Sequence, residues 1–305
     1  MTRAVVFAYH NVGVRSLRVL LAQGVQIDLV VSHEDNPAEN IWFGSVAQLC
    51  RDHDIPCITP TDPNTPEIEA RIAALAPDFV FSFYYRHMLK APILAAPTRG
   101  AFNLHGSLLP KYRGRVPVNW AIIHGETESG VTLHVMNVKP DNGAIVDQVA
   151  VPILPDDTAH DVFEKVTVAG ELCLIRALPK LIAGTATFTP QDLRLGGYFG
   201  GRKAEDGRIN WRQSATQLHN LVRAVTRPYP GAFSDTGRGR LTLWRSRCVD
   251  TAPAQPDATG AALWGAAGRL WLRMNDGTLL CVLDAELDGT PLTPDAPGLP
   301  LALES

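Results

Sequence analysis

The sequence has 305 residues, of which 46% are hydrophobic and 19% are charged. This composition is typical of a globular protein, and the length leaves room for about two domains. Twenty-eight lysines and arginines against 31 aspartates and glutamates give a formal net charge of −3. Because the charges nearly balance, we expect no general affinity for nucleic acid or an anionic membrane. An anionic ligand must therefore be bound by a few local basic groups.

The apolar runs and the cysteines indicate whether the protein enters a membrane and in which redox compartment it works. No apolar run approaches the roughly 20 residues that a membrane-spanning helix needs, so we expect no membrane insertion. The five cysteines are scattered and form no C-x-x-C pair. Reduced thiols in the cytoplasm therefore fit better than a disulfide framework or a zinc site, and we expect no bound metal.

The first half of the chain alternates strand and helix patterns. Strands are expected at residues 4–8, 27–32, 55–58, 79–83 and 101–105, and helices at 15–23, 45–53 and 66–75. Repeated strand–helix–strand units favour a mostly parallel, Rossmann-like sheet covered by helices. Ligands of such sheets bind beyond the carboxyl ends of the strands.

The pattern changes in the second half. The expected elements are a hairpin of strands 131–138 and 144–151, a helix at 159–183, an interdomain connection from about 185 to 207, and short strands after residue 232. Short strands at close intervals favour a small all-β, OB-like barrel. We therefore predict an α/β fold with a catalytic domain at residues 1–204 and a smaller β-rich domain at 205–305.

The turn after the first strand argues against a dinucleotide cofactor. It reads Ala8-Tyr9-His10-Asn11-Val12-Gly13, with one glycine where the G-x-G-x-x-G fingerprint needs three. The side chains of Tyr9 and His10 would block the approach of a pyrophosphate to the backbone. We therefore expect no NAD.

Asn103 and His105 are the strongest catalytic candidates. They are two residues apart on a predicted strand, so both side chains emerge on one face at its carboxyl end. A carboxamide beside an imidazole suits acyl transfer, because the amide stabilises an oxyanion while the imidazole moves a proton. The structural alternative is an asparagine that caps the strand and a histidine held by hydrogen bonds.

Asp141 favours the catalytic interpretation. It lies in the turn Pro140-Asp141-Asn142-Gly143. A carboxylate brought near His105 would favour the protonated imidazole and raise its pKa. An Asp-Asn-Gly turn is also an ordinary hairpin signal, and that alternative stays open.

Several motifs together resemble the folate-dependent formyltransferase family. They are residues 103–110 (NLHGSLLP), 112–114 (YRG), 130–134 (GVTLH) and 141–145 (DNGAI). They follow one another over about forty residues, so the resemblance is specific. It implies that Asn103 stabilises the transition state, that His105 is the general acid/base and that Asp141 tunes His105.

The resemblance also implies 10-formyltetrahydrofolate as co-substrate, with no metal. A basic cluster follows the catalytic strand, in which Arg115 could contact either the folate or a sugar nucleotide. Arg202 is a weaker substrate candidate, since a solvated arginine in a linker is the commoner case. The folate would lie against His87, Met88 and Leu89, and against Asn137, Val138, Lys139, Pro140 and Asp141.

Within the family, the resemblance is greatest to the enzymes that formylate the 4-amine of UDP-4-amino-4-deoxy-L-arabinose. It rests on residues 5–10 (VVFAYH), 81–87 (FSFYYRH), 106–115 (GSLLPKYRGR), 119–120 (NW) and 199–200 (FG) with Arg202. It implies a role in lipid A and lipopolysaccharide modification and in resistance to cationic antimicrobial peptides. In some bacteria this activity belongs to a bifunctional polymyxin-resistance protein, fused to an NAD-dependent decarboxylase. We expect here a stand-alone enzyme or an excised domain, with a second copy or a separate decarboxylase as candidate partners.

Four alternatives stay open. The acceptor could be another nucleotide-linked amino sugar, or water in a deformylase. A methionyl-tRNA formyltransferase would need a basic C-terminal domain, whereas residues 206–305 hold ten arginines, no lysine and ten acidic residues. A non-catalytic binding module would be expected to lack one of the three catalytic candidates.

Overall fold

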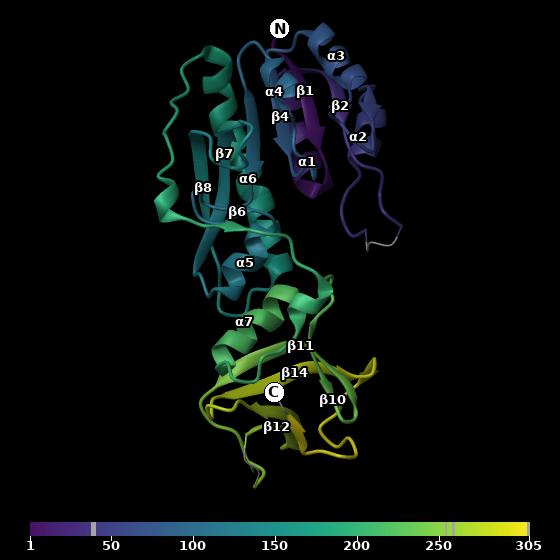
Figure 1. Ribbon diagram of the computed structural model, residues 1–305, viewed down its shortest axis with the longest axis vertical. Coiled ribbons are helices and arrows are strands. Elements are labelled where there is room, and N and C mark those ends of the chain that lie inside the picture. The colour runs from purple at the N-terminus through teal and green to yellow at the C-terminus, as the bar shows by residue number, and fades with distance from the viewer. Residues whose placement is uncertain (38–40, 254, 258–259, 304–305) are drawn as a thin grey trace. The chain divides into compact units, whose positions relative to one another are not determined.

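The computed structural model describes residues 1–37, 41–253, 255–257 and 260–303 (Figure 1). The chain divides into two compact units that interleave along the sequence. The first comprises Met1–Pro117, Glu128–Pro152 and Glu164–Gly200, and the second comprises Val118–Thr127, Ile153–Phe163 and Gly201–Ser305. The domain boundary near residue 205 stays a prediction.

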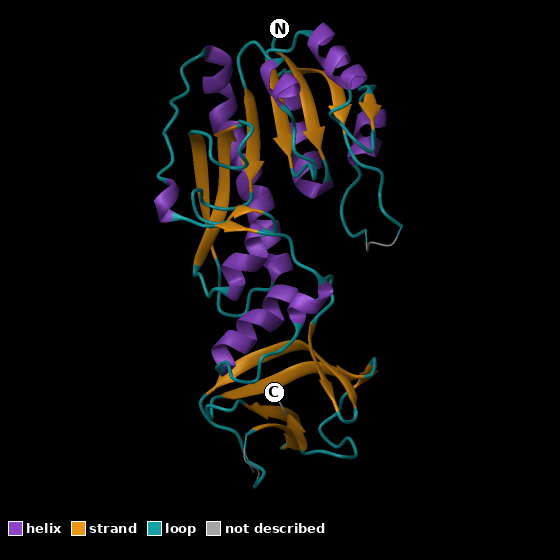
Figure 2. Cartoon of the chain, viewed as in Figure 1, coloured by secondary structure: helices purple, strands orange, loops and turns teal. Residues whose placement is uncertain are grey.

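The first unit contains a seven-stranded sheet in the order β3-β2-β1-β4-β5-β7-β8 (Figure 2). The strands from β1 to β5 run parallel, whereas β7 and β8 are antiparallel. The predicted Rossmann-like, mostly parallel sheet is confirmed. Its strands are β1 (Arg3–Ala8), β2 (Gln26–Val31), β3 (Cys57–Ile58), β4 (Phe79–Phe83), β5 (Ala101–His105), β7 (Glu128–Val135) and β8 (Ile145–Pro152).

Helices cover both faces of this sheet, because successive side chains of a strand point to opposite faces. On one face Val5 and Phe7 pack with Ile72 of α3 and Ile93 of α4. On the other face Gly13 of α1 comes so close to Ala8 that a Cβ on the glycine would crowd it. The helices are α1 (His10–Ala22), α2 (Val46–Asp52), α3 (Pro66–Leu75), α4 (Ala91–Ala95) and α6 (Ala159–Ala183), whose first residues belong to the second unit.

The helix ends follow the sequence. Ser45 and Thr65 accept hydrogen bonds from the first-turn amides of α2 and α3, and Pro66 occupies the first position of α3. Phe81 and Phe83 on β4 are fully buried and their rings stack. Both side chains therefore belong to the core of the sheet.

A short two-stranded ladder completes the first unit. It pairs β6 (Arg113–Gly114) with β9 (Tyr198–Phe199), which are distant in sequence. The 3₁₀ helix η1 (Leu193–Leu195) precedes β9.

The second unit contains an antiparallel, nearly barrel-shaped sheet in the order β10-β11-β14-β13-β12-β16, with β15 paired to β14. This confirms the predicted β-rich C-terminal part. Its strands are β10 (Ala232–Thr236), β11 (Gly239–Val249), β12 (Ala261–Ala266), β13 (Arg269–Arg273), β14 (Leu279–Leu287), β15 (Thr290–Pro291) and β16 (Leu301–Leu303). Its helices are α5 (Pro117–Ile123), η2 (Ala204–Gly207) and α7 (Ala215–Val225).

Across the described part of the chain, no helix combines the length and the apolar character that crossing a membrane would require.

Candidate active site

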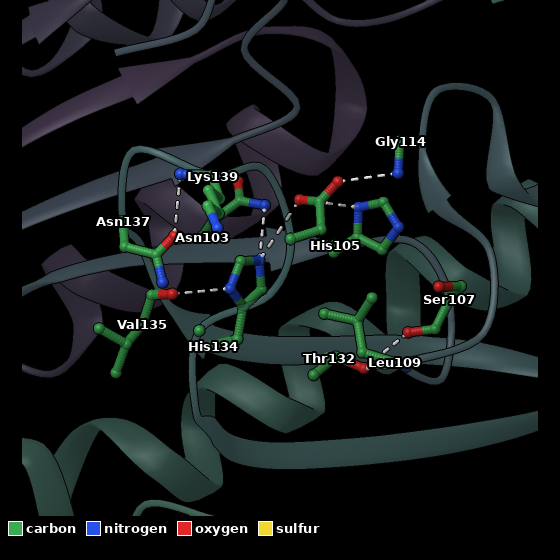
Figure 3. Close-up of polar contacts among 12 residues, drawn as sticks. Asn103, His105, Ser107, Leu109, Gly114, Thr132, His134, Val135, Asn137 and Lys139 are labelled. Atoms are coloured by element: carbon green, nitrogen blue, oxygen red, sulfur yellow. Dashed lines mark hydrogen bonds and ion pairs between the residues drawn. The ribbon is translucent and has the colours of Figure 1, made fainter. Parts of the chain in front are cut away.

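Two neighbouring strands bring the first site residues together. Asn103 and His105 occupy alternate positions at the carboxyl end of β5, as the sequence predicts. In the antiparallel register with β7, Asn103 faces His134 and His105 faces Thr132. Alternate residues share one face of a strand, so all four side chains belong to one face of the sheet. Figure 3 shows the amide of Asn103 and the ring of His134 directed toward one another.

Asp141 reaches the same place from the turn between β7 and β8. Its backbone is left-handed, with a φ of 53°, a conformation that aspartate tolerates better than most residues. Its carboxylate oxygen Oδ1 lies 3.6 Å from Nδ1 of His105 and 3.6 Å from Nε2 of His134. The other oxygen, Oδ2, accepts a hydrogen bond of 2.8 Å from the amide of Gly114.

The second partner of each imidazole determines where its proton lies. Nε2 of His105 is 2.8 Å from the carbonyl of Tyr112, and Nδ1 of His134 is 2.9 Å from the carbonyl of Val135. A carbonyl can only accept, so these two nitrogens carry the protons of the neutral rings. Nδ1 of His105 therefore presents a lone pair toward Asp141, and Nε2 of His134 accepts from the amide of Asn103 at 3.1 Å.

His134 is the site residue that the sequence reasoning missed. It appeared in the GVTLH motif, but no role was assigned to it. The available signal was the two-residue spacing of Thr132 and His134 on a predicted strand, which places both on one face. His134 is 2% exposed and orients the carboxamide of Asn103.

The loop after β5 is held by a buried hydroxyl network (Figure 3). Thr132, which is fully buried, donates to the carbonyl of Ser107 at 2.6 Å and accepts from the amide of Leu109 at 3.0 Å. Gln148 of β8 donates to the Thr132 hydroxyl at 2.8 Å and to the Leu109 carbonyl at 2.9 Å. The Ser107 hydroxyl donates to the carbonyl of Lys111 at 2.6 Å. The network thus fixes the loop that supplies the Tyr112 carbonyl to His105.

Burial sets the protonation of the pair. Desolvation lowers the pKa of His105 below its ordinary value of 6.5, and it outweighs the neighbouring Asp141 and the Tyr112 carbonyl, which both raise it. Asp141 raises this pKa, as the sequence predicts, but the larger effect of burial leaves it below the ordinary value. Burial opposes ionisation of Asp141, but the charge that His105 and His134 carry when protonated, together with the hydrogen bond from the Gly114 amide, lowers its pKa to about 2. The site thus holds a neutral imidazole beside an ionised carboxylate.

Such a set of groups suits transfer of an acyl group to an amine. The carboxamide offers N–H groups to a developing oxyanion, and the neutral imidazole can accept a proton at Nδ1. The adjacent carboxylate then stabilises the imidazolium. The structure brings the three sequence-predicted catalytic residues together.

The predicted folate-binding residues of the first unit form two groups. His87 and Met88 are exposed after β4, and Leu89 is buried. The second group lies in the turn from Asn137 through Val138, Lys139 and Pro140 to Asp141, whose first three residues are exposed. Within it, the backbone amide of Lys139 donates to the side-chain oxygen of Asn137 at 3.0 Å (Figure 3).

The two predicted substrate arginines belong to different units. Arg115 follows β6 in the first unit and its side chain is exposed. Arg202 is in the second unit, where its guanidinium lies 4.7 Å from the ring centre of Trp120 and donates to the carbonyl of Asp206 at 2.6 Å. A half-buried guanidinium on an aromatic ring differs from the solvated linker arginine that was the alternative.

A cavity of about 340 Å³ lies beyond the ends of β1, β2 and β3 on the same sheet. Its walls include Tyr9, His33, Asp35, Arg51 and Thr59. The Tyr9 hydroxyl donates to Asp35 at 2.8 Å. Within the described residues, no group of three or more histidines, cysteines, aspartates or glutamates is placed to hold a metal ion.

Known structures share this fold. An N-formyltransferase from Helicobacter canadensis, in complex with folinic acid and dTDP-3-aminofucose, is similar with a TM-score of 0.74, at 22% identity over 92% of this chain and 99% of that one. WlaRD, a sugar 3N-formyltransferase in the presence of dTDP and 5-N-formyltetrahydrofolate, is similar with a TM-score of 0.70, at 20% identity over 97% and 99%. HypX from Aquifex aeolicus, in complex with tetrahydrofolic acid, gives a TM-score of 0.63 at 18% identity, over 93% of this chain and 44% of that chain.

Family models match both parts of the sequence. The formyl transferase model matches residues 15–178, which is more than half of the chain, and the C-terminal domain model of the same family matches residues 202–294. The first range contains Asn103, His105 and Asp141, and the second contains most of the β-rich sheet. The chain therefore belongs to the formyl transferase family.

Proposed function

We propose that this enzyme transfers a formyl group from 10-formyltetrahydrofolate to the 4-amine of UDP-4-amino-4-deoxy-L-arabinose. The observation that carries the proposal is the arrangement of Asn103, His105 and Asp141. An oxyanion donor, a neutral base and an ionised carboxylate meet at the carboxyl end of β5. The cytoplasm and lipid A modification are the setting in which such a product would be used.

The reaction needs one bond to form and one to break. The lone pair of the sugar amine attacks the formyl carbon, and the carbonyl electrons move to the oxygen. Asn103 donates an N–H group to that oxyanion, and a single such donor typically contributes about 10²–10³-fold in rate. The carbonyl then re-forms, and the bond from the formyl carbon to N10 of the folate breaks.

His105 carries the proton between the two nitrogens. Its Nδ1 is unprotonated in the neutral ring and faces the carboxylate of Asp141 at 3.6 Å. Nδ1 accepts the proton that the attacking amine releases, and the imidazolium forms an ion pair with Asp141. It then gives the proton to the departing N10, so no net proton is gained or lost. Low exposure of His105, at 7%, strengthens this ion pair.

The folate assignment is supported by three similar proteins. The Helicobacter enzyme, WlaRD and HypX are described with folinic acid, 5-N-formyltetrahydrofolate and tetrahydrofolic acid. In this chain the folate would lie along His87, Met88 and Leu89 and along the turn from Asn137 to Asp141. That turn carries the catalytic carboxylate, so folate binding and catalysis share one segment. Arg115, an exposed cation in the same unit, is available to the folate tail or to a diphosphate.

The sugar nucleotide needs a second region of the protein. The stacked guanidinium of Arg202 suits a phosphate or a nucleobase, because its planar face and its donors can both be used. The acceptor nucleotide has one specific competitor. The Helicobacter enzyme and WlaRD are described with dTDP-3-aminofucose and dTDP. A dTDP-linked amino sugar is therefore the second candidate acceptor.

An acceptor panel tests the proposal. The purified protein receives 10-formyltetrahydrofolate with UDP-4-amino-4-deoxy-L-arabinose, with a dTDP-linked 3-amino sugar or with methionyl-tRNA, and each product is identified by mass spectrometry. We expect the highest kcat/KM for the UDP sugar. A higher kcat/KM for the dTDP sugar would instead identify a dTDP-linked amino sugar as the acceptor. A preference for methionyl-tRNA would overturn the sugar assignment.

A further inference from the structure

The segment of residues 189–199, here called the strap, follows α6 and was interpreted from the sequence as part of an interdomain connection. In the structure it belongs to the first unit (Figure 1). It begins at an isolated bridge, in which Thr189 and Ile145 exchange two backbone hydrogen bonds of 2.8 Å. It ends in β9, which pairs with β6. Both attachments lie next to segments that contact Asp141.

The first attachment holds the backbone of the catalytic turn. The side-chain amide of Gln191 donates to the carbonyl of Asp141 at 3.1 Å and to the carbonyl of Gly143 at 2.7 Å. The donor and these acceptors are 50 and 48 residues apart in sequence. The turn is tightly constrained, because Asp141 has a positive φ and a Cβ on Gly143 would overlap the carbonyl of Val135. Gln191 thus binds the turn on either side of Asn142.

The second attachment holds the donor that binds the carboxylate. The amide of Gly114 donates to Oδ2 of Asp141 at 2.8 Å. The backbone amides of the residues on either side of Gly114 donate to the strap. The amide of Arg113 donates to the Gly197 carbonyl at 3.0 Å, and the amide of Arg115 donates to the Phe199 carbonyl at 2.9 Å. A Cβ on Gly114 would overlap the Phe199 carbonyl, so the two segments are in close contact. The position of the Gly114 amide therefore depends on the strap.

We propose that the strap positions Asp141 toward His105 and that Gln191 is the positioning residue in it. The side chain of Gln191 fixes the backbone of the turn, while β9 fixes the amide that orients the carboxylate. Gln191 acts through Asp141 and contacts no reacting atom in this account. Its effect on turnover rests on the proposed formyl transfer, whereas its effect on the geometry does not.

Variants of Gln191 distinguish the effect of its two hydrogen-bond donors from the effect of its side-chain shape. Gln191→Met keeps a side chain of similar length and removes both donors. Gln191→Glu places an acceptor against two carbonyls, which repels the turn. Either change should displace the carboxylate, and His105 then loses a neighbour that favours its protonated form. His134 lies 3.6 Å from the same carboxylate oxygen, so its signal is followed in the same titration.

Histidine NMR measures this directly. The imidazole of His105 is titrated in the full chain, and His105→Gln identifies its signal. We expect a lower titration midpoint in Gln191→Met and in Gln191→Glu, and no change in Arg194→Gln. Arg194 is the matched control, since it lies on the same strap with a side chain that is 89% exposed. If Gln191→Met does not fold by circular dichroism, Gln191→Asn replaces it with the same expectation.

A double variant decides whether Gln191 acts through the carboxylate. In Asp141→Asn the charge is absent, so adding Gln191→Met should not move the His105 midpoint further. An unchanged midpoint in Gln191→Met alone, or an equal shift in both backgrounds, would overturn the proposal.

Turnover supplies a second measurement. We expect Gln191→Met to lower kcat by up to about 100-fold, the scale of a 1 Å misplacement, and to add no loss to Asp141→Asn. A full additional loss in the double variant would contradict the proposal. If no acceptor is formylated by the wild-type protein, the proposed function fails and the NMR titration still decides the role of Gln191.

Discussion

His105 and His134 face the same carboxylate oxygen at the same distance, yet their hydrogen bonds differ. Each ring is fixed by a backbone carbonyl, but through opposite nitrogens. His105 therefore presents an unprotonated Nδ1 to Asp141, where a proton can be accepted. His134 presents an unprotonated Nε2 to Asn103, where it orients an amide. At the scale of the residue, one hydrogen bond per ring distinguishes the proposed proton carrier, His105, from His134, which orients Asn103.

The proposed role of Asn103 predicts a defined loss of turnover on truncation to alanine. Asn103→Ala removes one oxyanion donor, so kcat should fall by about 10²–10³-fold with little change in KM. Steady-state kinetics with folate and acceptor measure this, alongside circular dichroism to show that the fold is kept. Asn210→Ala, at an exposed position of the second unit, is the control. A fall in the affinity for substrate with normal kcat would remove Asn103 from the transition state.

The protonation of His105 gives a second prediction. Because burial holds its pKa below 6.5, an NMR titration should place the midpoint below that value and lower still in Asp141→Asn. Folding then favours the neutral ring, so this contribution to stability is present above pH 6.5 and is lost as the pH falls below it. A midpoint above 6.5 in the wild-type protein would contradict the electrostatic account of the site.

At the scale of the element, the site depends on how the loop after β5 is tied to β7 and β8. Thr132 and Gln148 lie on those two strands and bind the loop through the carbonyl of Ser107 and both backbone groups of Leu109. Since the same loop supplies the carbonyl that fixes His105, the hairpin supports the imidazole as well as carrying Asp141. Two strands thus control both members of the pair.

Thr132→Val tests this connection with almost no change in shape. It leaves the Ser107 carbonyl and the Leu109 amide without their buried hydroxyl partner, which should cost about 1–3 kcal/mol of unfolding free energy. Urea denaturation followed by circular dichroism measures the loss. Thr132→Ser should retain most of the stability, and Thr242→Val on β11 should cost less. Equal costs for Thr132→Val and Thr132→Ser would show that the hydroxyl does not hold the loop.

Periodicity was sufficient to predict the parallel sheet and the shared face of Asn103 and His105, because both follow from local spacing. The meeting of His105 with Asp141 was a hypothesis that the family resemblance strengthened, since 36 residues separate them in the chain and no local spacing joins them. Gln191 carried no local signal, because its partners depend on the path of the chain after α6. The direction in which Asp141 changes the pKa of His105 could be predicted, whereas the larger opposing effect of burial could not, because the degree of burial depends on tertiary packing.

At the scale of the whole molecule, the charge of the protein indicates whether it binds a small substrate or a polyanion such as nucleic acid. Two arginines of the second unit pair with carboxylates, Arg227 with Asp284 and Glu286 and Arg240 with Asp235. The net charge of −3 argues against a general affinity for a nucleic acid backbone.

Binding measurements test this interpretation of the charge. Fluorescence anisotropy with labelled tRNA should show only weak binding at physiological salt, whereas the sugar nucleotide should bind with a shallow salt dependence. Tight tRNA binding with a steep salt dependence would instead indicate an unrecognised basic surface.

The central claim is that Asn103, His105 and Asp141 move a formyl carbon from folate to an amine. The most direct measurement follows that carbon by NMR, using 10-formyltetrahydrofolate labelled with ¹³C in the formyl group and UDP-4-amino-4-deoxy-L-arabinose as acceptor. The account predicts that the label appears as a sugar formamide with the wild-type protein and does not with His105→Ala. Label that accumulates as free formate, or equal transfer by His105→Ala, would contradict it.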